Sequence, residues 1–154
     1  MEDTELTLLH PNHVKATRLV AILISLPLLA GAIIAEFAAP LVPGLIIVPA
    51  LLILAFIIFR LPWRRYQARG YTLAEERLRV VSGILFRSDT LVPFGRVQHI
   101  DVNQGPIQRI YDLATLTVHT AGSHNASVNL PGLAHGDATE MREAIRAAIK
   151  RDTA

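Results

Sequence analysis

The chain has no cysteine among its 154 residues. This absence excludes disulfide bonds, thiol nucleophiles and cysteine-ligated metal sites. The sequence also lacks a Gly-x-Ser-x-Gly turn, a glycine-rich phosphate loop and a Walker pattern, which mark serine hydrolases and nucleotide-binding proteins. Its net charge is only +2, so there is no overall electrostatic reason to expect a nucleic-acid partner. We therefore expect no enzyme, no cofactor and no small-molecule substrate.

Charged residues are also missing from two long apolar runs, Leu19 to Ala35 and Leu41 to Phe59, of 17 and 19 residues. At the α-helical rise, such runs extend about 25–29 Å, close to the bilayer's hydrocarbon thickness of about 30 Å. The gap between them is short, and Glu36 is its one ionisable residue. Backbone polar groups cannot stay unpaired in lipid, so the runs predict a transmembrane helical hairpin over residues 19–60.

Basic residues occur at the two outer ends of the predicted hairpin, which lie on the same side of the membrane. Lys15 and Arg18 precede the first run, and Trp63 and Tyr66 follow the second, where interfacial aromatic residues are common. The loop between the runs contains neither Lys nor Arg. The positive-inside rule therefore predicts that both termini are cytoplasmic and that Glu36 lies outside. The arginines after the second run, called here the basic flank, are Arg60, Arg64, Arg65 and Arg69.

A signal peptide is the main alternative for the first run, because the small residues Ala38 and Ala39 follow it. The segment before the run would then contain three acidic residues, and a second apolar run follows at once, which argues against cleavage. We therefore prefer a hairpin preceded by a cytoplasmic segment, residues 1–18. Within the second helix, Pro43 suits the first turn and Pro49 is expected to cause a kink.

Residues 66–151 show period-2 alternation interrupted by turn residues, which is typical of short antiparallel strands. A Ser82-Gly83 turn and Pro93 delimit one expected strand, from Ile84 to Val92. The segment predicts a cytoplasmic antiparallel sandwich or barrel, with a single helical turn beginning at Pro106. The other alternating segments are Tyr71–Leu73, Leu78–Val80, Ile100–Val102, Leu116–Val118 and Val128–Leu130.

The chain ends in a predicted amphipathic helix of about 14 residues. Asp137 and Glu140 have the spacing of a capping box at its start. The opposite face carries Arg142, Arg146 and Lys150, which either bind an anionic partner or form an ordinary solvated face. An apolar stripe is expected to cover the sheet. The stripe consists of Met141, Ala144, Ile145, Ala148 and Ile149.

Several segments occur in an order that is similar to one known family. They are Leu9-His10-Pro11, Tyr71-Thr72-Leu73, Gly83-Ile84-Leu85, residues 92–100, Gln108-Arg109 and residues 113–122. In this order they resemble the YdbS-like bacterial pleckstrin-homology (PH)-like membrane proteins. Asp112 departs from the family's usual glycine, but aspartate can adopt the left-handed conformation.

The resemblance implies an α+β membrane protein in the bacterial cytoplasmic membrane. Its transmembrane hairpin would be followed by a PH-like antiparallel sandwich of about seven strands, closed by the C-terminal helix. PH-like folds host several functions, so the resemblance implies little chemistry. One hypothesis is a scaffold that binds another membrane protein, either a longer relative with several such domains or a second copy. By analogy with the family, such a scaffold could serve envelope stress or tolerance of antimicrobial peptides.

The second hypothesis is a sensor of anionic lipid headgroups, and an enzyme of unknown class is the third. The basic flank and Trp63 form the main candidate site. These arginines either act as a topology signal, attracting anionic headgroups by about 1 kcal/mol each, or combine with Arg77, Arg79 or Arg96 in a specific headgroup site. A protein partner would instead use an uncharged strand edge or loop, such as Gly122 to Asn125.

Six histidines raise the possibility of a metal site, but their spacing does not support one. Neither the pair His10 and His13 nor the pair His119 and His124 has a nearby carboxylate or cysteine in zinc-like spacing. His99 and Asp101 share the polar face of a predicted strand and could act as base and orienting group. The sequence places no nucleophile beside them, so hydrogen bonding on the strand face is the expected role.

Overall fold

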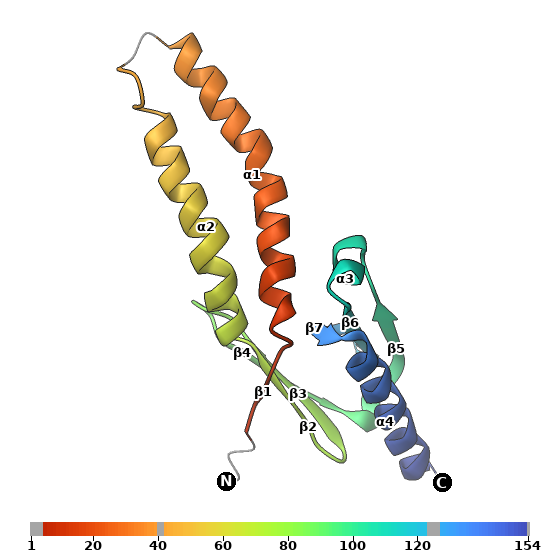
Figure 1. The fold of residues 1–154 in the computed structure, drawn as a ribbon. Helices are drawn as coiled ribbons and strands as arrows, with labels where there is room; N and C mark the ends of the chain where they lie inside the picture. The colour runs from red at the N-terminus through yellow and green to blue at the C-terminus, as the bar shows by residue number, and fades with distance from the viewer. Residues whose placement is uncertain (1–4, 40–41, 123–126, 154) are drawn as a thin grey trace.

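A computed structural model of the chain describes residues 5–39, 42–122 and 127–153. Two long helices leave a β-rich domain side by side and form an antiparallel hairpin (Figure 1). Helix α1 comprises Asn12–Ala38 and helix α2 comprises Ile47–Gln67. Both are long and apolar enough to cross a membrane, and almost none of their apolar residues are buried within the protein. The predicted helical hairpin is confirmed.

The start of α2 differs from the expected geometry. Pro49 does not lie in the helix interior, because α2 begins at Ile47. It therefore occupies the first turn, where the missing N–H has no intrahelical partner to lose, and the predicted kink is wrong. The Glu36 carboxylate at the end of α1 accepts backbone N–H groups from Gly44, from Ile46 at 2.9 Å and from Ile47 at 3.3 Å. Glu36 thus caps the second helix from the first, where a negative charge is favourable.

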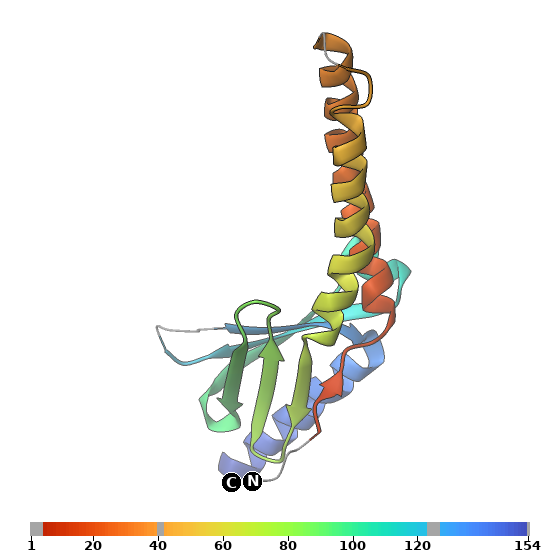
Figure 2. The same cartoon turned by 90° about the vertical axis from the view of Figure 1, so that its left-hand side faces the viewer.

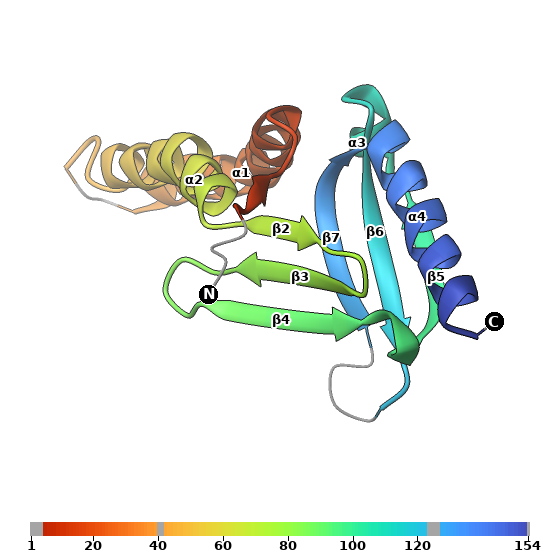
Figure 3. The same ribbon diagram turned by 90° about the horizontal axis from the view of Figure 1, so that it is seen from below.

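The strands form two antiparallel sheets, which meet at a steep angle when seen from below (Figure 3). No pairing joins the two sheets within the described residues, so the sandwich stays open instead of closing into a barrel. The first sheet has the order β1 (Thr7–Leu8), β2 (Gly70–Leu73), β3 (Arg77–Ser82) and β4 (Ser88–Pro93). The second has the order β5 (Val97–Asn103), β6 (Leu113–Thr120) and β7 (Ser127–Ala134).

Strand β1 precedes the hairpin in sequence but belongs to the first sheet. Thr7 pairs with Tyr71 and Leu8 with Gly70 across the β1–β2 ladder. The next residue, Leu9, is buried in the main hydrophobic core. The hairpin is therefore inserted between two strands of one folded unit. We call this unit, made of β1 to β7 and the helices α3 and α4, the β-domain.

The expected strand from Ile84 to Val92 begins later than predicted. Strand β4 starts at Ser88, and residues 83–87 form the loop between β3 and β4. Gly83 starts this loop with φ of 114°, a conformation that favours glycine. Its backbone direction takes Ile84 and the two residues after it out of the ladder. The apolar composition that predicted a strand therefore belongs to an exposed loop.

The short helix predicted at Pro106 is confirmed as α3 (Pro106–Ile110), with the proline in its first turn. The Gln108 side chain accepts the Gly105 N–H at 2.9 Å and donates to Thr115 Oγ1 at 2.8 Å, which ties α3 to β6. The turn after α3 depends on Asp112, whose φ is 53°. The expected left-handed conformation of this aspartate is confirmed.

Helix α4 (His135–Thr153) is longer than the predicted helix and begins two residues before Asp137. Asp137 therefore lies in the first turn, where a carboxylate is still favourable, instead of at the expected cap. The predicted stripe is buried at Met141, Ile145 and Ala148, whereas Ala144 faces solvent. The helix packs against the second sheet and the 3-10 turn η1 (Phe94–Arg96), and it completes the core between the sheets (Figure 2).

Candidate membrane-interface site

The basic flank lies where α2 leaves the apolar part of the hairpin and enters the β-domain. Arg60, Arg64 and Arg65 are exposed in the last turns of α2, and Arg69 follows at the entry to β2. The ring of Trp63 lies 5.8 Å from that of Tyr66, and Trp63 is about half exposed. An arginine cluster beside an amphipathic aromatic ring is typical of the headgroup layer of a membrane.

A groove of about 650 Å³ separates the end of α2 from the β3–β4 loop. Arg64, Arg65 and Arg69 line it on the helix side, beside the apolar residues Phe56 and Leu61. The opposite wall consists of Ser82, the last residue of β3, and residues 83–86 of the loop. The fold thus brings three of the four flank arginines together around one groove, whereas Arg60 and Trp63 do not line it. The groove thus combines basic groups with apolar side chains.

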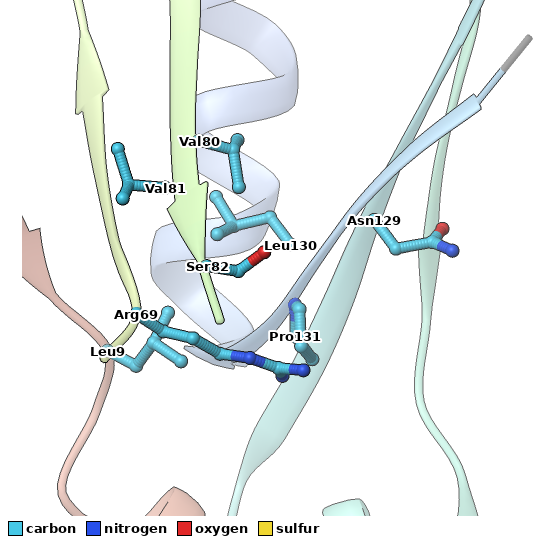
Figure 4. Close-up of a pocket in the computed structure, with 8 residues that line it drawn as sticks. All are labelled: Leu9, Arg69, Val80, Val81, Ser82, Asn129, Leu130 and Pro131. Carbon is cyan, nitrogen blue, oxygen red and sulfur yellow. The ribbon is translucent and has the colours of Figure 1, made fainter. Parts of the chain in front are cut away.

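Arg69 extends from this groove into a small cavity of about 120 Å³ between the two sheets (Figure 4). Its side chain passes Leu9 and its guanidinium points toward Pro131 of β7, which lines the same cavity. Partial burial, and secondly the charge of Arg65, lower the pKa of Arg69 from its usual value. No acceptor in the described part of the chain bonds its guanidinium. Arg69 therefore retains hydrogen-bonding capacity for an added anionic group.

Arg79 of β3 and Asp89 of β4 are diagonal neighbours in the β3–β4 ladder and form a side-chain pair away from the groove. Arg79 Nε donates to Asp89 Oδ1 at 2.9 Å. This bond is the main cause that lowers the pKa of the Asp89 carboxyl. Strand β3 begins at Arg77, at the end of the sheet remote from the hairpin, and Arg96 follows β4 at that same end (Figure 2). The fold does not bring Arg77 or Arg96 to the basic flank.

The cationic face of α4 is also separate from the basic flank. Helix α4 runs away from the hairpin toward the opposite end of the molecule (Figure 1). Glu143 lies between Arg142 and Arg146, with its Oε1 at 3.0 Å from the first and 3.6 Å from the second. The cationic face, which also includes Lys150, is thus partly neutralised within the helix. It forms no common surface with the arginines beside α2.

The histidines occupy structural positions in the described residues. His99 Nε2 lies 2.7 Å from the Asp101 carboxylate on the same strand, β5, and His119 Nε2 lies 3.3 Å from that carboxylate across the β5–β6 ladder. His10 Nδ1 accepts the Asn12 N–H at 3.2 Å at the start of α1. Within the described ranges, no group of three or more metal-binding side chains is placed to hold an ion. His124 lies outside these ranges, as does most of the Gly122–Asn125 loop suggested for a protein partner.

The helical hairpin, the open two-sheet sandwich and the closing α4 define a membrane-anchored PH-like module. A family model described as a bacterial PH domain matches residues 6–149. The chain therefore belongs to the bacterial PH domain family. The match begins before the hairpin and so includes β1, which agrees with the pairing of β1 with β2 in one sheet.

A curated relative agrees with this assignment. The chain is 33% identical over 88 residues to the transmembrane protein YdbS of Bacillus subtilis (strain 168). The aligned region covers 57% of this chain and 54% of the relative, so the chain spans about half the length of the curated protein it matches. No solved structure gives a significant match. The membrane localisation follows from the two apolar helices and this transmembrane relative.

Sequence reasoning missed two parts of this site. The first is the loop of residues 83–87, which forms one wall of the groove and was interpreted as strand. The second is Arg87, which lines a neighbouring cavity with Arg69. The Ser82-Gly83 pair was the available signal in the sequence, because an apolar segment directly after a turn glycine need not resume the ladder.

Proposed function

We propose that the protein is a non-catalytic interaction module, which the hairpin holds at the cytoplasmic face of the bacterial cytoplasmic membrane. There it assembles with another membrane protein, either a relative with further PH-like domains or a second copy. Membership of the bacterial PH domain family supports a non-catalytic role. The observation that carries the assembly proposal is the unpaired edge of β4.

Strand β4 is the last strand of its sheet, with β3 on one side and no neighbour on the other among the described residues. The Phe94 N–H donates to the Glu76 carbonyl at 2.9 Å, and Pro93 is paired with Arg77. Hydrogen-bonded and non-hydrogen-bonded pairs alternate along an antiparallel ladder, so the Pro93–Arg77 pair next to this bond is a non-hydrogen-bonded one. Leu91 and Asp89, two and four residues earlier, therefore also direct their backbone groups to the free edge. A partner strand could add to the sheet there.

The β4 edge is tested by replacing Leu91 with proline in the full chain. Proline removes the outward N–H of Leu91 but breaks no hydrogen bond to β3. Pro93, two residues later, already shows that a proline is accommodated where the backbone faces the free edge. We expect Leu91→Pro to keep the protein folded and to lose a partner protein that copurifies with wild type in mild detergent. Leu91→Ala keeps the N–H and should retain the partner.

Thr90→Pro is the matched disruptive control, because Thr90 faces β3 and the substitution breaks the ladder. Retention of a stoichiometric partner by Leu91→Pro would rule out strand addition at β4. Purification of the wild type with anionic lipid and without protein would contradict assembly and favour the lipid-sensing alternative. That second function is supported by the groove in which Arg64, Arg65 and Arg69 meet apolar walls.

The orientation in the membrane is a further prediction. Both termini should be cytoplasmic, because the basic residues of α1 and α2 lie at the ends of the helices next to the β-domain. A reporter that is active only outside the cytoplasm should be inactive when fused after Ala154. The same reporter should be active when inserted between Ala38 and Ala39. The opposite pattern, or cleavage after the first apolar run, would contradict this topology.

A further inference from the structure

The β3–β4 loop exposes an apolar tip that the fold of the β-domain leaves uncovered. Leu85 and Phe86 are each 90% exposed, and Ile84 beside them is partly exposed. Two large apolar side chains exposed side by side are unfavourable in water, and such a cluster marks a contact surface. The conformation of the loop depends on its first residue. A Cβ on Gly83 would lie 1.8 Å from the Phe86 carbonyl oxygen, so only glycine permits this turn.

The position of the loop identifies what it contacts. Ile84, Leu85 and Phe86 line the same groove as Phe56 and Leu61 of the membrane-spanning α2. In two perpendicular views the loop lies beside the domain-side end of α2 and points in the direction of the hairpin (Figures 1 and 2). The exposed tip therefore lies beside the apolar residues at the domain-side end of α2, next to the basic flank.

A second apolar tip lies on the other flank of the hairpin. Helix α3 contacts α1 and lies beside its lower part in both views (Figures 1 and 2). Ile110 at the end of α3 is 70% exposed, and the preceding Arg109 is exposed as well. The two tips thus project from the β-domain on the hairpin side, one next to each helix.

Basic residues accompany both tips. Arg64, Arg65 and Arg69 line the groove behind the β3–β4 loop, Arg87 follows the loop, and Arg109 precedes Ile110. An apolar tip with basic residues just behind it is the pattern of a segment that lies in the interface of an anionic bilayer. Both tips face the membrane. Contact with lipid explains this shared direction, whereas contact with a soluble protein would not require it.

We propose that the β3–β4 loop and the end of α3 insert into the leaflet next to the β-domain, with Leu85, Phe86 and Ile110 in the lipid. The hairpin alone would leave the domain and its two helices free to tilt together in the bilayer. Contacts on both flanks hold one face of the domain against the bilayer, so that the β4 edge keeps a fixed orientation. This inference is independent of the assembly proposed above, because it involves no protein partner.

The absence of cysteine from the chain allows a direct depth measurement. Leu85→Cys, Phe86→Cys and Ile110→Cys are each labelled with an environment-sensitive fluorophore in the full chain, reconstituted in nanodiscs containing anionic lipid. These side chains are exposed, so the substitutions remove no core contact. Glu75→Cys, in the exposed β2–β3 turn at the far end of the sheet, is the matched control.

We expect the three tip labels to lose most of their emission to lipids brominated in the upper acyl chain and to resist quenching by aqueous iodide. Interfacial insertion of roughly 5–10 Å also predicts weaker quenching by bromines near the bilayer centre. The Glu75→Cys label should show the reverse pattern. Iodide quenching at either tip equal to that of the control would overturn the proposal. That result would leave the copurification test of β4 unaffected.

Discussion

Replacing Ile145 by alanine is expected to lower the free energy of unfolding of the β-domain by about 2–5 kcal/mol. Ile145 is completely buried in the core that α4 completes between the two sheets. Its truncation removes apolar contacts and leaves a cavity that the surrounding strands can fill only in part. The change can be measured by urea-dependent proteolysis of the full chain in detergent, with the cleavage of the β-domain as the readout.

Ile145→Asp is expected to have a larger effect and to prevent accumulation of the folded domain. The carboxylate would be placed among apolar side chains without a partner, and an unpaired buried charge is strongly destabilising. Arg146→Ala is the matched control on the exposed face of the same helix. Its contact with Glu143, at 3.6 Å, is solvent-exposed, so the stability should change by less than about 1 kcal/mol. Equal tolerance at the two positions would mean that α4 does not pack as described.

Gly132→Ala is expected to destabilise the junction between the hairpin and the β-domain by about 2–3 kcal/mol. Gly132 has φ of 76°, which an alanine adopts only with strain. A Cβ at this position would lie 2.6 Å from Cγ of His13 in the first turn of α1. Relief of this clash would move the start of α1 and weaken the bond from the His10 N–H to the Gly132 carbonyl, now 2.7 Å.

The same proteolysis titration measures this effect, and Gly136→Ala is its control. Gly136 lies in the first turn of α4, and a Cβ there meets no atom within 4 Å. Since alanine is a better helix former than glycine, Gly136→Ala should stabilise by about 0.4–1 kcal/mol. A neutral Gly132→Ala would show that the hairpin does not rest on β7 as the structure places it. Loss of this junction should also change the depth at which the β3–β4 loop meets the membrane.

Much of the fold was predictable because the spacing of apolar residues along a helix or strand indicates which of its faces is buried. The two uncharged runs required membrane-spanning helices, since lipid offers no partner for a polar backbone. Alternation along strands such as β6 and the stripe through Met141 and Ile145 of α4 identified residues that the structure buries. The left-handed Asp112 followed from the chemistry of one turn. Each of these features depends on neighbours within a few positions in sequence.

The candidate site depended on contacts between distant segments, and the sequence predicted only its arginines. Four basic residues after an apolar run are recognisable as an interfacial flank. That these arginines lie next to the β3–β4 loop cannot be recognised from the sequence. The groove forms only after β3 and β4 have paired and α2 has packed against the β-domain. The same apolar residues, Ile84 to Phe86, satisfy the pattern of a strand and that of an exposed membrane tip. The backbone direction set at Gly83 decides between the two.

The sequence by itself determined the membrane hairpin, the absence of thiol chemistry, the β-rich character of the second half and the buried face of its last helix. Only the tertiary structure decided that Thr7 and Leu8, ahead of the hairpin, join β2 as a sheet strand. It also decided that Arg64, Arg65 and Arg69, but not Arg77 or Arg96, surround one groove. The physical reason is that periodicity specifies which face of an element is buried, whereas ladder register and packing specify what it is buried against.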